Sequence, residues 1–137
     1  MRVLFVKPDK MAFETEIKDD LTSLQEAVGG HIQAIFPFDD PVALICNEES
    51  KLMGLPLNRA LYDSNGRIYD IVAGDFFLTG LGEDDFSDLS DEFMKKYTEH
   101  FKYPEIFFRS GNEIVAIKQT EGYMEDIAEK GLSEPLL

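Results

Sequence analysis

The sequence contains one cysteine, two histidines and no tryptophan, and these scarcities exclude several kinds of site. A single thiol cannot form an intrachain disulfide. Together with two separated histidines it cannot complete a zinc tetrad either. Cys46 lies in an apolar run, where a buried, reduced thiol is expected. We therefore expect a chain that holds no metal and no cofactor and that acts in a reducing compartment.

Long apolar runs are also missing from the chain. The N-terminal run Val3–Val6 is too short for a signal peptide. No other stretch approaches the roughly 20 apolar residues that span a bilayer. We expect a cytoplasmic protein that does not engage a membrane.

Basic residues are few, with 13 bases against 27 acids and a net charge of −14. The imbalance is uneven, because residues 1–69 carry 11 acids and 7 bases whereas residues 70–137 carry 16 acids and 6 bases. Phosphate backbones and anionic membranes repel such a chain. We expect no direct nucleic-acid binding, and a protein partner, if there is one, should be basic.

The residues that are present describe one folded domain of 137 residues, because 44% hydrophobic residues is too many for a disordered chain. Runs rich in β-branched and aromatic residues predict strands. These lie at residues 2–7, 12–17, 31–38, 42–46, 52–53 and 68–79, the last with a bulge at Gly74. Asn65-Gly66 is a hairpin turn signal, and a further hairpin is expected at 105–118.

Helices are predicted where apolar residues recur at helical spacing between capping residues. They are expected from Leu21 to Val28 after Asp19-Asp20, from Asp91 to Phe101 after Ser90, and from Tyr123 to Lys130, with a single helical turn at Asn58–Tyr62. Strands and helices do not alternate regularly. The sequence therefore predicts a single α+β domain with an antiparallel or mixed sheet and two or three helices.

Two segments are candidates for a functional site. The first is acidic, with six acids and no base in ten residues: Glu83, Asp84, Asp85, Asp88, Asp91 and Glu92. It lacks the ligand order of an EF-hand, so it is a solvated loop, a contact surface for a basic protein, or a cation site. The glycines just before it, Gly80 and Gly82, lack the third glycine of a dinucleotide loop and indicate only a glycine-rich strand end.

The second candidate is Asn58-Arg59. The two side chains are interpreted either as a local cap and an ion pair, or as a polar pair lining a pocket for a small anionic ligand. No nucleophile elbow is present, and Asp39-Asp40 stands between prolines as a turn rather than a catalytic pair. No catalytic residue is assigned.

The segments Leu21–Ile32, Asn47–Leu61 and Ile68–Gly80 resemble the family catalogued as domain of unknown function 3846. The resemblance covers roughly residues 1–101. It leaves the final hairpin and helix, residues 102–137, as an addition. It implies an accessory protein of a phage, plasmid or conjugative element with a role in host interference or regulation. It implies no activity and no site residues.

Four functions are compatible with these observations. The first is a non-catalytic accessory protein that binds a basic protein partner, including interference with host defence. The second is an acidic DNA mimic that blocks a nuclease or restriction enzyme, and the third is a small-ligand binder or enzyme with a pocket near Asn58 and Arg59. A structural or assembly role is also compatible.

Overall fold

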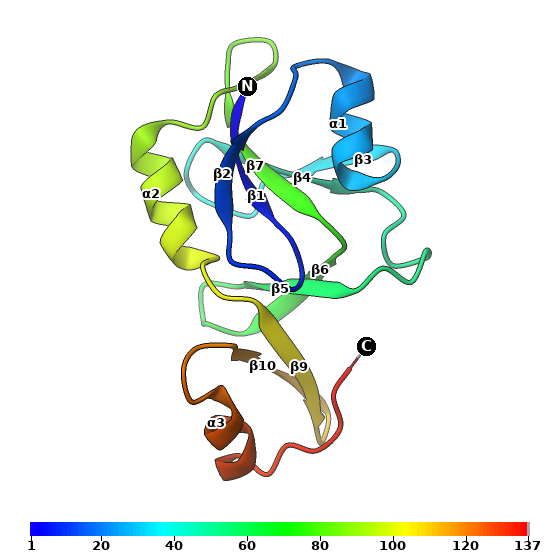
Figure 1. Ribbon diagram of the computed structural model, residues 1–137, viewed down its shortest axis with the longest axis vertical. Coiled ribbons are helices and arrows are strands. Elements are labelled where there is room, and N and C mark those ends of the chain that lie inside the picture. The colour runs from blue at the N-terminus through cyan, green and yellow to red at the C-terminus, as the bar shows by residue number, and fades with distance from the viewer. Residues whose placement is uncertain (137) are drawn as a thin grey trace.

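Six strands form one antiparallel sheet in the computed structural model, which describes residues 1–136 (Figure 1). The strand order is β2-β1-β7-β4-β3, and β8 pairs with β7 beyond this path. The strands are β1 (Arg2–Val6), β2 (Phe13–Glu16), β3 (Ile32–Ile35), β4 (Val42–Asn47), β7 (Phe76–Leu81) and β8 (Phe86–Ser87). The two central strands β4 and β7 are almost wholly buried, as a sheet covered on both faces requires.

Two helices cover opposite faces of this sheet (Figure 1). The helix α1 (Leu21–Val28) packs on the face that carries Phe5, and α2 (Asp91–His100) packs on the face that carries Leu4. Neighbouring residues of a strand point to opposite faces, so β1 contributes to both hydrophobic cores. The result is a three-layer arrangement with the sheet in the middle.

Two antiparallel hairpins lie below the sheet in Figure 1. The first consists of β5 (Leu57–Tyr62) and β6 (Ile68–Ala73), and the second of β9 (Glu105–Ser110) and β10 (Glu113–Lys118), followed by α3 (Tyr123–Glu129). A small apolar cluster of Ala60, Ile71 and Phe107 joins them. The hairpin outside the family-like segment is thus anchored on the hairpin inside it.

The predicted α+β class and its three helices are confirmed. The side chain of Asp20 accepts a hydrogen bond from the Ser23 amide, and Gly29 ends α1 with a φ of 77°. Ser90 caps α2 in the same way, and acidic residues follow in its first turn. Cys46 is buried, as its apolar surroundings predicted.

Three local predictions are wrong. Asn58–Tyr62 lies in strand β5 instead of a helical turn, because the backbone pairs with β6 across the Asn65-Gly66 turn. Residues 52–53 lie in a turn instead of a strand, closed by the bond from the Met53 amide to the Glu49 carbonyl. The strand predicted at 68–79 is two strands in different sheets, separated at Gly74 where φ is 75°.

Candidate functional site

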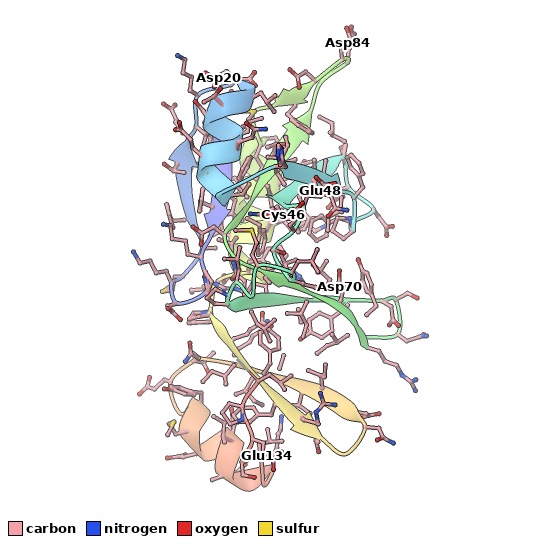
Figure 2. The ribbon with its side chains drawn as sticks, turned by 90° about the vertical axis from the view of Figure 1, so that its right-hand side faces the viewer. Asp20, Cys46, Glu48, Asp70, Asp84 and Glu134 are labelled. Atoms are coloured by element: carbon pink, nitrogen blue, oxygen red, sulfur yellow. The ribbon has the colours of Figure 1, made fainter. Side chains whose placement is uncertain are left out.

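The acidic segment 83–92 divides into two parts with different surroundings. Glu83, Asp84 and Asp85 form the exposed tip of the hairpin between β7 and β8. Asp84 projects from the upper end of the molecule in Figure 2, beyond the sheet. None of the three carboxylates forms an ion pair among the described residues 1–136. The tip therefore concentrates uncompensated negative charge.

Asp88 and Asp91 are instead held by Arg2. The Asp88 carboxylate accepts a hydrogen bond from the Arg2 amide at 2.8 Å, and the Asp91 carboxylate accepts one from the Arg2 guanidinium at 2.9 Å. Arg2 also pairs with Glu14 at 2.6 Å. The ion pair partly neutralises Asp91, whereas the neutral amide holds Asp88 without compensating its charge. Both contacts fix the base of the segment against β1, and the free charge is concentrated at the tip.

Further acids lie at the same end of the molecule. Asp20 is close to the upper end in Figure 2, at the start of α1, and Glu92 is exposed in the first turn of α2. We call the tip Glu83–Asp85 with Asp20 and Glu92 the acidic end. The structure thus places acids that are distant in sequence at one end of the molecule, where Lys18 pairs with Asp20 at 3.6 Å.

Asn58 is fully buried in β5 and holds two other segments together. Its side-chain amide donates to the Val6 carbonyl at 2.9 Å and to the Gly74 carbonyl at 2.8 Å. The first bond joins β5 to the end of β1, and the second fixes the turn between β6 and β7. The amide therefore ties the hairpin to the sheet.

Arg59 is also fully buried, and its guanidinium is surrounded by oxygen acceptors. It donates to the Lys7, Lys10 and Phe101 carbonyls at 2.8–3.3 Å and to the Asn58 side chain at 2.9 Å. Burial lowers the pKa of Arg59 to about 10, while Glu105 acts in the opposite direction. The group keeps its charge at neutral pH, and carbonyl oxygens rather than a paired carboxylate solvate it.

A groove of about 480 Å³ lies beside these two residues, which do not line it. Its walls are residues 7–10, the end of α1, the loop at 53–56, and the turn at 74–75. We call it the turn groove. Asn58 and Arg59 hold the 74–75 and 7–10 walls through the carbonyls of Gly74, Lys7 and Lys10. The predicted polar pair is therefore beneath a groove wall and faces the protein interior.

Glu105 connects the second hairpin to β5. Its buried carboxylate accepts a hydrogen bond from the Ala60 amide at 3.1 Å. Burial raises the pKa of Glu105, whereas the Ala60 amide, Arg59 and Lys118 lower it by a smaller amount. The carboxylate thus satisfies a main-chain donor that β5 would otherwise leave unpaired.

Replacing Glu105 with glutamine is expected to keep or raise stability at neutral pH, because the amide oxygen still accepts from Ala60 without a buried charge. The pKa of Glu105 is higher in the folded protein than in the unfolded chain, so protonation of Glu105 stabilises the folded wild type. This stabilisation is complete at a pH below the unfolded-state pKa and is lost as pH rises through the folded-state pKa. The stability gap between the variant and the wild type should therefore narrow as pH falls. Urea unfolding from about pH 8 to about pH 5 measures it.

Glu105→Ala is the matched comparison. It removes the acceptor and should cost about 1–3 kcal/mol at every pH, because the Ala60 amide stays buried and unpaired. A glutamine variant that loses as much stability as the alanine variant would show that the charge itself is needed.

Two features of the structure escaped the sequence analysis. Asp40 accepts hydrogen bonds from Lys96 at 2.5 Å and from the buried Tyr97 at 2.6 Å, which fastens the 36–41 loop to α2. These bonds, from Lys96 first, lower the pKa of Asp40. The prolines around Asp40 indicated a turn, but nothing in the sequence identified its partners.

The other feature is a groove of about 890 Å³ between the two lower hairpins, which we call the hairpin groove. Residues of β5, β6 and β10 line it, together with Leu136. No pattern in the sequence indicated that these hairpins meet.

No group of three or more histidine, cysteine or acidic side chains in residues 1–136 is arranged to hold a metal ion. None of the helices described there is long and apolar enough to cross a membrane.

The fold and these surfaces define a small acidic α+β domain with a charged hairpin tip and two open grooves. The chain belongs to the family described as domain of unknown function (DUF3846), whose model matches residues 1–102. No curated protein and no solved structure matches the chain. Every residue of the turn groove lies inside the matched range, whereas the hairpin groove includes residues after 102.

Proposed function

We propose that this protein is a non-catalytic accessory protein of a phage or other mobile element, and that in the cytoplasm it binds a basic protein partner. The observation that carries the binding proposal is the exposed tip Glu83–Asp85, whose three carboxylates form no ion pair among residues 1–136. The mobile-element setting, including interference with host defence, rests on the family resemblance alone.

Charge of one sign at a projecting tip speeds encounter with a partner of the opposite sign more than it raises affinity. The tip connects the paired strands β7 and β8, so little conformational entropy is lost when its carboxylates bind a partner. Since the Arg2 guanidinium already compensates Asp91, the remaining free charge is less dense than that of duplex DNA. This favours a basic protein surface over the DNA-mimic alternative.

The small-ligand alternative stays a prediction for the turn groove. It is supported by the walls that Asn58 and Arg59 hold and by a volume in the range of ligand pockets.

Neutralising the tip with Glu83→Gln, Asp84→Asn and Asp85→Asn is expected to slow association with the partner roughly tenfold at low salt and to flatten its salt dependence. Folding should be unchanged, because the one hydrogen bond of these side chains within residues 1–136 is the bond that Asp85 accepts from the Phe86 amide at 2.7 Å, and the asparagine oxygen can still accept it. A pull-down from host lysate at two salt concentrations, with the captured protein identified by mass spectrometry, supplies the partner. Stopped-flow kinetics then measure the association rate.

The matched control removes three charges at the far end of the chain through Glu121→Gln, Glu125→Gln and Glu129→Gln. Equal slowing by both triple variants would mean that net charge, not the tip, steers the partner. A partner displaced by duplex DNA and lost with the tip variant would favour the DNA mimic.

A further inference from the structure

The hairpin groove collects exposed apolar side chains from three strands. Tyr62 of β5, Tyr69 of β6 and Ile114 of β10 are 39%, 54% and 38% exposed, and all three line it. Large apolar groups that gather in a concave surface mark binding sites more often than scattered ones do. The groove is therefore a candidate site separate from the acidic end.

The edge of β10 along this groove has unpaired main-chain groups. A two-residue turn joins β9 to β10, so Ser110 and Glu113 form the first hydrogen-bonded pair. The alternation then directs the amides and carbonyls of Ile114 and Ala116 away from β9. In the part of the chain that the structure describes, β10 pairs with β9 alone.

The opposite edge of the same hairpin demonstrates what these groups can do. Phe107 and Arg109 pair with Ala116 and Ile114. The main-chain groups of Phe107 and Arg109 that point away from β10 form hydrogen bonds with residues 134 and 136. The Arg109 amide donates to the Glu134 carbonyl at 3.4 Å, and the Phe107 carbonyl accepts from the Leu136 amide at 2.7 Å. An extended segment thus already adds to one edge of this hairpin.

Two other strand edges in the molecule are protected by charge. On β6 the Ile71 amide donates to the Asp70 carboxylate, which also pairs with Lys51 at 2.5 Å. On β2 the edge carries Glu14 and Glu16. Charged groups of this kind discourage strand addition. Between Glu113 and Lys118, β10 has four apolar residues and no such protection.

We infer that the open edge of β10 in the hairpin groove docks an extended, uncharged, apolar segment of a protein partner as an added strand. Lys51 and Arg67 balance Asp70 and Glu113 along the lining, so the groove has no net charge in a chain of −14. A neutral segment suits it, whereas a second copy of this chain would bring another −14. The inference rests on the proposed function only in taking the partner to be a protein.

The added strand would bond to the amides and carbonyls of Ile114 and Ala116. Its alternate side chains would contact Tyr62 and Tyr69. A five-residue segment, about 17 Å long, covers β10 from Ile114 to Lys118.

Ala116→Pro tests this geometry. Proline removes the outward amide and its ring blocks an incoming strand, while the Ala116 position gives no amide to the β9 ladder. The probe is a displayed library of random twelve-residue peptides selected on the wild-type protein. We expect neutral peptides with alternating apolar residues, whose affinity falls at least about tenfold on Ala116→Pro.

Two further variants keep the test decisive if the proline disturbs folding. Tyr69→Ala should weaken the same peptides, whereas Met124→Ala, at an exposed position on α3, should not. Failure to select any peptide, or peptides that bind Ala116→Pro as tightly as the wild type, overturns the inference. A dimer that Ala116→Pro dissociates in analytical ultracentrifugation also overturns it, because the occupant would be a second copy.

The triple variant of the tip separates this inference from the proposed function. Glu83→Gln, Asp84→Asn and Asp85→Asn together should leave peptide affinity unchanged, since none of them lines the groove. Slower association with the basic partner together with unchanged peptide affinity supports both proposals. An unchanged association rate contradicts the proposed function alone, and a loss of peptide affinity contradicts this inference alone.

Discussion

Replacing Arg59 with methionine is expected to lower the free energy of unfolding by about 4 kcal/mol. The guanidinium is fully buried and donates to the carbonyls of Lys7, Lys10 and Phe101. Methionine has a similar length but no donor, so the buried Phe101 carbonyl and the partly buried Lys7 and Lys10 carbonyls lose their partner. Each buried acceptor left unpaired costs about 1–3 kcal/mol. Urea unfolding followed by circular dichroism measures the change.

Two comparisons isolate the role of the guanidinium. Arg59→Lys keeps the charge but donates to fewer oxygens. Its free energy of unfolding should fall by roughly half as much as that of Arg59→Met. Arg109→Met removes an exposed arginine and should stay within about 0.5 kcal/mol of the wild type. If the free energy of unfolding of Arg59→Met lies within about 1 kcal/mol of the wild-type value, the hydrogen bonds of the guanidinium do not stabilise the fold as expected.

The helices could be predicted from the sequence because their determinants are local. Leu24 and Val28 recur at helical spacing between Asp20 and Gly29, and both are buried as the spacing required. Tyr97 and Phe101 are likewise buried on one side of α2. A cap and an apolar stripe lie within a dozen residues, so a short window of sequence contains the whole pattern.

The segment at Asn58 could not be predicted in that way, because its conformation depends on distant partners. The Asn58 side chain reaches the Val6 carbonyl 52 residues away, and Arg59 reaches the Phe101 carbonyl 42 residues away. From the local sequence alone, Asn58 was interpreted as a helix cap and Arg59 as the base of an ion pair. The tertiary contacts override that local preference and place both side chains in the interior.

The candidate site was predictable in charge but not in arrangement. Counting acids located the segment Glu83–Glu92, and the structure places its first three acids at one exposed tip. The amide that holds Asp88 and the guanidinium that pairs with Asp91 both belong to Arg2, 86 and 89 residues away. The hairpin groove was beyond prediction for the same reason, since it exists only where two hairpins pack together.

Replacing Gly80 with alanine is expected to destabilise the protein by about 3 kcal/mol and to release the acidic hairpin from the sheet. A Cβ atom at position 80 would lie 2.3 Å from the Asp88 carbonyl oxygen, which is main chain and cannot rotate away. That segment cannot retreat either. The Arg2 amide donates to the Asp88 carboxylate at 2.8 Å, and the buried Leu89 donates its amide to the Arg2 carbonyl at 2.9 Å.

The glycine at the strand end is thus explained by the close approach of β8 to β7, where no side chain fits. Gly80→Ala should speed hydrogen exchange at residues 81–88, because β8 must separate from β7, and association with a basic partner should slow as the tip loses its fixed position. Gly82→Ala is the graded control, since its Cβ would lie 3.1 Å from the Asp85 carbonyl oxygen and a small shift relieves the contact. Equal exchange rates in the two variants would show that β8 shifts easily to make room for a side chain at position 80. The fixed presentation of Glu83–Asp85 would then not be a property of this fold.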